Sequence, residues 1–449
     1  MKKETLKIDL LNGNINKGLL LFALPMILGN LLQQLYNIAD TVIVGKFVGA
    51  DSLAAVGSAY SLMTFITSVI IGLCMGSGSV FSYYMGRREN QKLKECTQTA
   101  FALIGVISVF IWIIVQIFIN PILRILQIPN EIYDLMYQYT SIVFLGIIFI
   151  FLYNYCAFAL RAVGNSVVPL YFLGATSVLN IGLDLIFVLI FKWELRGAAI
   201  ATVISQAISG IGLCIYTWIK ESQFRFSIKG FLSGNKPYKE ILNLSITSSV
   251  QQSVMNFGIL MVQGLVNSFG TDVMTAFAAG VKVDTFAYMP AQEFGNAYSI
   301  YVSQNYGAGQ NDRIKKGTKT AMRTSAIFCS IISIIVCVCA NQLMKVFVNA
   351  EEGMIIKIGV TYLRIEGIFY VLIGILFLLY GYFRGINKPS VSLLLTIISL
   401  GTRVILAYIL SSIPFINVNG IWCSIPIGWF LADLIGICII KRLAINKNQ

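Results

Sequence analysis

Apolar blocks of about twenty or more residues recur along the whole chain, and charged residues, Gly or Pro end each of them. A transmembrane helix needs roughly 20 such residues, whereas a membrane β-barrel would show shorter segments of alternating polarity. The pattern therefore predicts an all-α polytopic membrane protein with twelve transmembrane helices. The predicted spans lie near residues 18–44, 53–82, 97–120, 135–158, 167–191, 197–219, 241–268, 274–302, 319–344, 355–380, 390–411 and 420–440.

The two halves of the chain resemble each other. A shift of 221 positions aligns ten identical pairs, among them Gly49 with Gly270 and Asp51 with Asp272, and most of the pairs cluster around the connection between the second and third spans. Six spans per half give both copies the same orientation, so we expect two six-helix lobes related by a pseudo-twofold axis along the membrane normal, a layout suited to alternating access. The predicted domains are an N-lobe at 1–219, a cytoplasmic linker at 220–240 and a C-lobe at 241–449.

Positive charge is concentrated in alternate connections. The N-terminus, the even-numbered connections and the C-terminus hold 24 of the 33 Lys and Arg residues, including Arg161, Arg384 and Lys388. Cytoplasmic loops carry such an excess, so both termini are predicted to be cytoplasmic. This topology also accounts for the net charge of +13, and we expect no nucleic-acid partner.

Composition narrows the chemistry further. The chain is 57% hydrophobic and only 12% charged, with a mean hydropathy of +0.78, while soluble domains carry about 25% charged residues. It contains no His, which excludes His-based acid–base catalysis and His metal sites. Nine scattered Cys residues without a CxxC pair are typical of small buried hydrophobic side chains.

Carboxylates inside predicted spans are the main candidates for function, because an ionised side chain at the bilayer centre costs about 2.5–3.5 kcal/mol. In the first half Asp40, Asn180, Asp184 and Thr202 all lie six to twelve residues from a charged anchor on the extracellular side. At 1.5 Å per residue they share a layer roughly 9–18 Å deep. A proton or a small cation would relieve the repulsion between two carboxylates placed there, and a purely structural hydrogen bond between helices is the competing interpretation.

The second half also holds acidic residues in its predicted spans. Asp284 follows Lys282 by two residues, and Pro290 nearby permits an irregular helix that could pair them. We expect Glu293 and Asp433 to serve structure or to line an aqueous vestibule. Glu366 lies nearer the end of its span.

Three segments carry a family resemblance. They are LPMILGNLLQQLYNIADTVIVGKFVGADSLAAVG (24–57), NIGLDLIFVLIFKWELRGAAIAT (180–202) and MPAQEFGNAYSIYVSQNYGAG (289–309). In combination they resemble the multidrug and toxic compound extrusion (MATE) family and its DinF-like branch, over nearly the whole chain. The resemblance implies a twelve-helix, cation-coupled efflux antiporter with two six-helix lobes.

The resemblance also implies roles for single residues. Asp40, Asn180, Asp184 and Thr202 match the cation or proton site of the N-lobe, with Gln33, Tyr36 and Tyr139 as members of the surrounding network. One branch of the family relies on acidic residues in the seventh span, where this chain has Gln251, Gln252 and Met255. We therefore expect Gln251, Gln252 and Asp284 to bind substrate rather than the coupling ion.

The expected function is antiport by alternating access, in which amphipathic, cationic organic compounds leave the cell against inward Na⁺ or H⁺. Oxygen ligands suit both ions, so the choice stays open, and we expect no other metal or cofactor. The chain lacks a GxxxxGK[ST] motif for ATP. We expect a monomer with several spans in the plasma membrane.

Other functions fit the sequence less well. The main alternative is a lipid-linked saccharide flippase of a related fold, which would need a basic cavity for pyrophosphate, and intramembrane basic residues are few (Lys282, Arg403). An enzyme is not expected, because the chain has neither His nor a GxSxG motif. A twofold repeat with buried carboxylates also suits alternation better than a continuous channel.

Overall fold

The computed structural model describes residues 7–126, 128–225 and 238–445. These residues form α-helices with short 3₁₀ and π segments, and none of them lies in a strand. Nine of the described helices are long and apolar enough to cross a membrane, and one bent pair adds a tenth. The prediction of an all-α polytopic membrane protein is confirmed.

Contacts divide the chain into two compact units. The first comprises Met1–Asp9 and Leu24–Ser249, and the second comprises Leu10–Ala23 and Val250–Gln449. The predicted lobe boundaries stay a prediction, because most of the linker expected at 220–240 lies outside the described residues.

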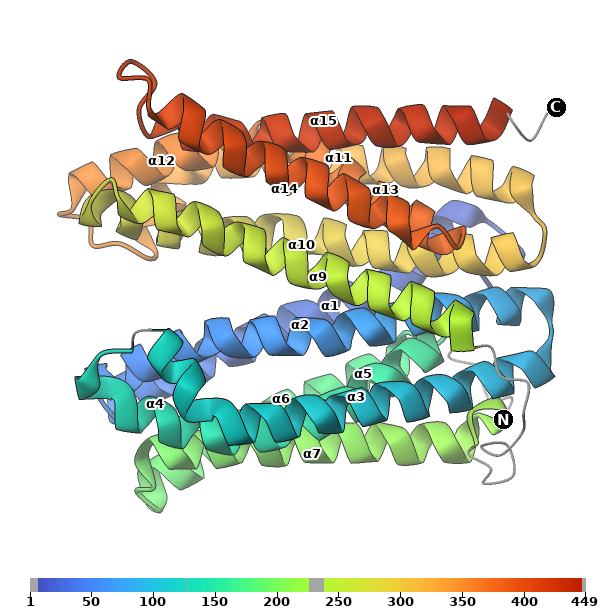
Figure 1. Ribbon diagram of the computed structural model, residues 1–449, viewed down its shortest axis with the longest axis horizontal. Helices are drawn as coiled ribbons and strands as arrows, with labels where there is room; N and C mark the ends of the chain where they lie inside the picture. The colour runs from blue at the N-terminus through green and yellow to red at the C-terminus, as the bar shows by residue number, and fades with distance from the viewer. Residues whose placement is uncertain (1–6, 127, 226–237, 446–449) are drawn as a thin grey trace. The chain divides into compact units, whose positions relative to one another are not determined.

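Six long helical segments, two of them interrupted, lie wholly or mostly in the first unit, although residues 15–23 of the first segment belong to the second unit (Figure 1). They are α1 (Ile15–Phe47), α2 (Ala50–Arg87), α3 (Asn90–Ile125), α4 (Asn130–Val143) continued by η1 (Phe144–Gly146) and α5 (Ile147–Ala162), α6 (Val167–Leu185) continued by the π-helix η2 (Ile186–Ile190), and α7 (Glu194–Lys220), followed by the short η3 (Ser222–Phe224). Helix α5 packs between α2 and α7, and α6 packs along α7. Their facing side chains form one apolar core that includes Phe81, Phe151 and Tyr155.

Six further long segments lie wholly or mostly in the second unit, although residues 238–249 of the first of them belong to the first unit. They are α9 (Tyr238–Asn267), α10 (Thr271–Gly307), α11 (Asn311–Lys345), α12 (Gly353–Gly367) with α13 (Tyr370–Gly385), α14 (Pro389–Ser411) and α15 (Asn419–Ile445). Helices α12 and α13 meet at a bend of 52°. Helix α14 packs along α15, and α10 packs along α13, around a core that includes Phe277, Phe383 and Trp422.

Small residues bring α10 and α13 together. A Cβ atom added to Gly381 on α13 would lie 2.5 Å from the backbone oxygen of Gly295 on α10, and one added to Gly295 would lie 2.8 Å from the backbone oxygen of Phe377. Only Gly permits such a close approach of two helix backbones. This crossing positions the polar side chains of both helices that are described below.

Large apolar side chains remain exposed along the outer faces of several helices. On α3, Val106 and Ile117 are 69% and 66% exposed, and on α11, Ile334 and Val338 are 65% and 71% exposed. Such faces are unfavourable in water but suit contact with lipid chains. They are consistent with a helix bundle that is surrounded by a bilayer.

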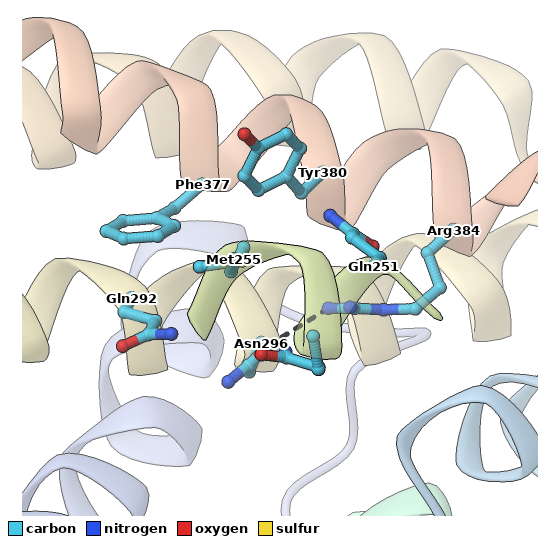
Figure 2. Close-up of a pocket in the computed structure, with 8 residues that line it drawn as sticks. Gln251, Met255, Gln292, Asn296, Phe377, Tyr380 and Arg384 are labelled. Atoms are coloured by element: carbon cyan, nitrogen blue, oxygen red, sulfur yellow. Dashed lines mark hydrogen bonds between the residues drawn. The ribbon is translucent and has the colours of Figure 1, made fainter. Parts of the chain in front are cut away.

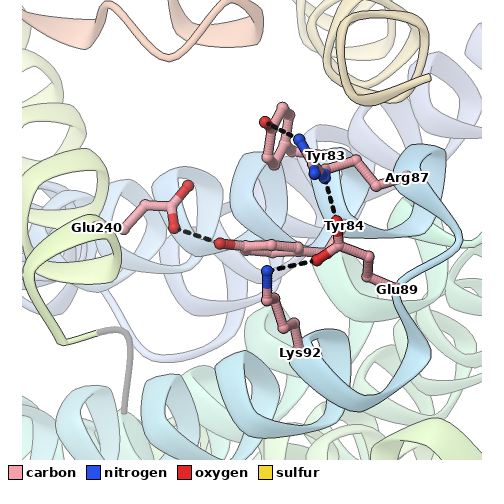
Figure 3. Close-up of polar contacts among 6 residues, drawn as sticks. All are labelled: Tyr83, Tyr84, Arg87, Glu89, Lys92 and Glu240. Carbon is pink, nitrogen blue, oxygen red and sulfur yellow. Dashed lines mark hydrogen bonds and ion pairs between the residues drawn. The ribbon is translucent and has the colours of Figure 1, made fainter. Parts of the chain in front are cut away.

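Polar contacts hold the turn between α2 and α3 (Figure 3). Glu89 forms ion pairs with Lys92, at 2.7 Å, and with Arg87, and these two cations lower the pKa of the half-buried Glu89 carboxyl. The Tyr84 hydroxyl donates to Glu240 of α9 at 2.7 Å. The turn between α2 and α3 is therefore held by ion pairs within it, and a hydrogen bond connects the end of α2 to the first turn of α9.

The internal repeat extends to backbone conformation. Gly164, after α5, and Asn387, after α13, both have positive φ angles, of +86° and +58°. Asn tolerates this left-handed conformation better than most residues. The departure from Gly at Asn387 is therefore compatible with the same turn in both halves.

Candidate functional site

The four residues predicted to hold the coupling ion are all buried in the first unit. Asp40 lies on α1, Asn180 and Asp184 lie on α6, and Thr202 lies on α7. None is more than 8% exposed, and Asp184 is fully buried. Helix α6 packs against α7, and Leu173 on its first half faces Gly29 of α1.

The polar atoms of this group lack partners. Both oxygens of Asp184, both polar atoms of Asn180 and Oδ1 of Asp40 are buried without a hydrogen-bond partner among the described residues. A buried polar group left unsatisfied costs about 1–3 kcal/mol, and more when it is charged. A purely structural hydrogen bond between Asp40 and Asp184 is therefore not what the side chains make.

The two carboxylates are close enough to repel each other electrostatically. The buried Tyr139 of α4 lies within electrostatic range of both carboxylates. Tyr36 of α1 lies within electrostatic range of Asp40. Gln33, one turn before Tyr36, approaches the Tyr36 hydroxyl. The structure thus brings the predicted network residues to the two carboxylates.

Local helix geometry explains this placement. Asn180 and Asp184 are four residues apart and share a face of α6, and the π-helix η2 begins two residues after Asp184. Single π turns recur at functional sites because they shift side chains out of regular helical register. Carboxylate, amide and hydroxyl oxygens together are ligands that suit a proton or a hard cation.

A polar cleft lies in the second unit, and the space between its walls and in the open solvent at its mouth amounts to about 260 Å³. Figure 2 shows its lining side chains. They come from α9 (Gln251, Gln252, Met255), α10 (Gln292, Asn296) and α13 (Phe377, Tyr380, Arg384). Gln251 donates from Nε2 to Oγ1 of Thr396 at 3.1 Å. The two glutamines predicted to bind substrate therefore do line one cleft, whereas Asp284 is not among its lining residues.

Asp284 belongs to a separate buried cluster. The Tyr362 hydroxyl donates to its Oδ2 at 2.5 Å, and the Tyr370 hydroxyl donates to its Oδ1. Glu366 is close enough to share a hydrogen bond with Asp284, and Arg403 lies within electrostatic range of both acids. The pairing of Asp284 with Lys282 does not occur, because Lys282 is exposed and lies 5.9 Å from the ring centroid of Phe347.

A match to a family model shows which protein family the chain belongs to. The model described as MatE matches residues 25–186 and 244–409, which together make up well over half of the chain. The chain belongs to the MatE family. As a MATE family transporter, it is a multi-pass membrane protein.

Individual relatives agree with this assignment. The "Probable multidrug resistance protein YpnP" of Bacillus subtilis is 29% identical over 391 residues, which is 87% of both proteins. The "Probable multidrug resistance protein NorM" of Thermotoga maritima is 24% identical over 96% of this chain and 92% of its own length.

Solved structures share the fold. One described as the outward-facing conformation of a multidrug resistance MATE family transporter matches 99% of both chains, at 24% identity and a TM-score of 0.92. A MOP superfamily transporter from Pyrococcus furiosus matches 99% of both chains, at 24% identity and a TM-score of 0.91. The predicted architecture of twelve helices in two six-helix lobes is thereby confirmed for this MATE transporter. Its assignment to the DinF-like branch stays a prediction.

Sequence reasoning missed two buried groups of this MATE transporter. Glu366 was placed near a span end, yet it is only 3% exposed and belongs to the Asp284 cluster. A usable signal was present, because Tyr362, Glu366 and Tyr370 recur every four residues across the α12–α13 bend. Arg384 was assigned to a cytoplasmic connection, yet it lies in the last turn of α13 and is 3% exposed.

Proposed function

We propose that this MATE transporter is a cation-coupled antiporter that exports amphipathic organic compounds, cationic ones among them, in exchange for inward H⁺ or Na⁺. The buried carboxylates of Asp40 and Asp184, three of whose oxygens have no hydrogen-bond partner among the described residues, are the observation that carries the coupling. The names of the relatives, which are multidrug resistance proteins, support the substrate class and favour it over a lipid-linked saccharide.

The coupling follows from electrostatics. Two carboxylates within range of each other and out of water repel, and desolvation penalises both charges. A bound proton or Na⁺ relieves both penalties, so the ion stabilises one arrangement of the surrounding helices. Release of the ion on the other side of the membrane restores the repulsion, and the two arrangements then alternate.

The available energy is sufficient for export. One elementary charge that moves through about 100 mV releases about 2.3 kcal/mol, and a tenfold concentration ratio costs about 1.4 kcal/mol. One coupling ion exchanged for one uncharged substrate molecule therefore supports a gradient of roughly fiftyfold, whereas a monovalent cationic substrate is driven by the concentration gradient of the ion. No ATP site is needed for this.

Purified protein in proteoliposomes tests the proposal. Efflux of ethidium is measured under an imposed Na⁺ gradient at equal pH, and then under a pH gradient without Na⁺. We expect one of the two gradients to drive efflux and an uncoupler of that gradient to stop it. Ethidium efflux that neither gradient accelerates in active protein would contradict the proposed coupling.

A further inference from the structure

One basic side chain of the second unit lies inside the cleft instead of at a surface. Arg384 is 3% exposed and lines the cleft with the amides of Gln251, Gln252, Gln292 and Asn296. We propose that this cleft binds the carboxylate group of a substrate and that the Arg384 guanidinium is its principal partner. The proposal rests on the transport function proposed above and names the substrate chemistry that the second unit recognises.

The partners of Arg384 leave its charge available. Its Nε donates to Oγ of Ser299 at 3.1 Å, and its Nη2 donates to Oδ1 of Asn296 at 3.0 Å. Both acceptors are neutral, and no ion pair within the described part of the chain includes Arg384. A guanidinium carries five N–H donors in a planar fork, so these two bonds orient the group and leave further donors on the side of the cleft.

A second interaction holds the neighbouring amide in place. Asn296 accepts from Arg384 through Oδ1 and donates from Nδ2 to Oε1 of Glu293 at 3.2 Å. Glu293 acts on Arg384 through space and is not among the residues that line the cleft. Its charge offsets part of the cost of burying the guanidinium, while the cleft itself presents only the positive group.

The internal repeat shows that the fold does not need these polar groups. At the 221-residue offset, Gln292, Asn296 and Ser299 correspond to Ile71, Met75 and Gly78 of the first half. The arginine that occupies the corresponding turn, Arg161, lies over the ring of Phe158 at 5.1 Å. The same helical framework is therefore built with apolar residues in one half and with a polar cleft in the other, which favours a ligand over a purely structural role.

The chemistry of the lining selects a carboxylate. The planar fork of Arg matches a carboxylate in two parallel hydrogen bonds, and neutral amides add donors without further charge. A phosphate or pyrophosphate dianion would call for more than one cation in the cleft, and an ammonium group would be repelled by Arg384. The rings of Phe377 and Tyr380 offer apolar contact for the body of the same molecule (Figure 2).

Calorimetric titration with three matched naphthalene compounds tests the proposal on the purified full chain in detergent. The probes are 2-naphthoate, the neutral 2-naphthamide and the cationic 2-naphthylmethylamine. We expect wild-type protein to bind naphthoate about tenfold or more tightly than naphthamide, because a charge-assisted hydrogen bond contributes more than a neutral one. Equal affinity for the acid and the amide, or tightest binding of the amine, overturns the proposal.

Two variants assign the preference to Arg384. In Arg384→Gln the advantage of naphthoate over naphthamide should disappear, while Arg384→Lys should retain part of it.

Because Arg384 is buried and its removal could impair folding, Gln292→Glu provides an independent test at a half-buried lining residue. Its new carboxylate should pair with Arg384 and lower the affinity for naphthoate by a larger factor than the affinity for naphthamide. Unchanged naphthoate preference in folded Arg384→Gln or Gln292→Glu protein refutes the assignment.

Glu293→Gln is a matched variant that should change the naphthoate affinity in the opposite direction. It removes a negative charge that acts on Arg384 from outside the cleft, so naphthoate affinity should rise and naphthamide affinity should stay constant. A fall in naphthoate affinity would contradict the proposed role of Arg384. These titrations need no ion gradient. If neither gradient drives efflux of ethidium or of naphthoate while Arg384-dependent binding is intact, only the coupling is refuted; gradient-driven efflux without Arg384-dependent binding refutes only the cleft.

Discussion

Single buried polar side chains distinguish the two halves of this transporter. In the first unit, Asp40 and Asp184 are buried with oxygens that lack hydrogen-bond partners. A bound ion or proton would satisfy these oxygens. In the second unit, both Asp284 oxygens accept tyrosine hydroxyls. Asp40 and Asp184 are therefore unsatisfied whereas Asp284 is well satisfied, and we expect substitutions at these two places to have different consequences.

Asp184→Asn should abolish gradient-driven ethidium efflux, because an amide cannot exchange a proton and binds a cation more weakly than a carboxylate does. Asp433→Asn is a matched control, since Asp433 is also buried with both oxygens unpartnered among the described residues, but it lies on α15 of the second unit. Efflux by the control should persist. Full coupled efflux by Asp184→Asn in proteoliposomes would remove the coupling site from α6.

Asp284→Asn should alter the affinity for exported compounds while ion binding to the purified protein survives. The amide keeps the volume of the side chain, but it weakens the hydrogen bonds from Tyr362 and Tyr370 and so shifts α13, which carries part of the cleft. Ion binding is measured in parallel on Asp40→Asn. Loss of ion binding in Asp284→Asn together with retention in Asp40→Asn would move the coupling site to the second unit.

Tyr370→Phe should lower the stability of the purified protein by about 1–3 kcal/mol, because it leaves a buried Asp284 oxygen without its donor. Thermal unfolding in detergent measures the effect. Tyr408→Phe is the control, since Tyr408 is 54% exposed on α14, and its midpoint should stay near wild type. Equal midpoints for both variants would mean that the Tyr370 bond contributes nothing.

Helices extend beyond the apolar blocks that predict them. The block at 97–120 belongs to α3, which runs from Asn90 to Ile125, because hydropathy reports the membrane-spanning length and the amphipathic ends continue the helix outside it. Two other predicted spans are interrupted, at η1 between α4 and α5 and at the bend between α12 and α13. Hydropathy does not register such breaks, since the flanking residues remain apolar.

Gly381→Ala should destabilise the crossing of α10 and α13, because the new methyl group would lie 2.5 Å from the Gly295 oxygen. Forced repacking of this kind costs typically 1–3 kcal/mol. Gly401→Ala on α14 is the control, since a Cβ there meets nothing within 4 Å; it should leave the stability equal or increase it by up to about 1 kcal/mol. Thermal unfolding midpoints of the two variants in detergent decide between tight and loose packing at this crossing.

For the molecule as a whole, the distribution of basic residues predicts the orientation in the membrane. Exposed connections are available at both predicted sides: Asp51, Asp272 and Asn417 on one and Asn90 and Asn311 on the other. In a background without the nine cysteines, single Cys residues at the first three positions should react with an impermeant maleimide added to intact cells. Those at Asn90 and Asn311 should react only after lysis, and the reverse pattern would invert the topology. A further predicted inner position, Asn235, lies outside the described residues.

The sequence was sufficient for the features that depend on local pattern. Span length, the positive charge of alternate connections and the internal repeat are properties of consecutive residues, and they established an all-α, two-lobed membrane protein. The depth of Asp40, Asn180, Asp184 and Thr202 followed from counting residues to charged anchors, because a helix rises by a constant distance per residue. All four side chains are buried within the first unit, and their depth in the membrane stays a prediction.

Only the tertiary structure decided which polar side chains meet. Asp284 binds Tyr362 and Tyr370, which are 78 and 86 positions away, and no local pattern specifies such partners; the nearest charge in sequence, Lys282, points elsewhere. Arg384 has the sequence context of a loop cation, yet the close crossing at Gly295 and Gly381 places it against Asn296 and Ser299 of α10. Burial of a side chain depends on which helix faces it, and that is determined by packing between distant segments.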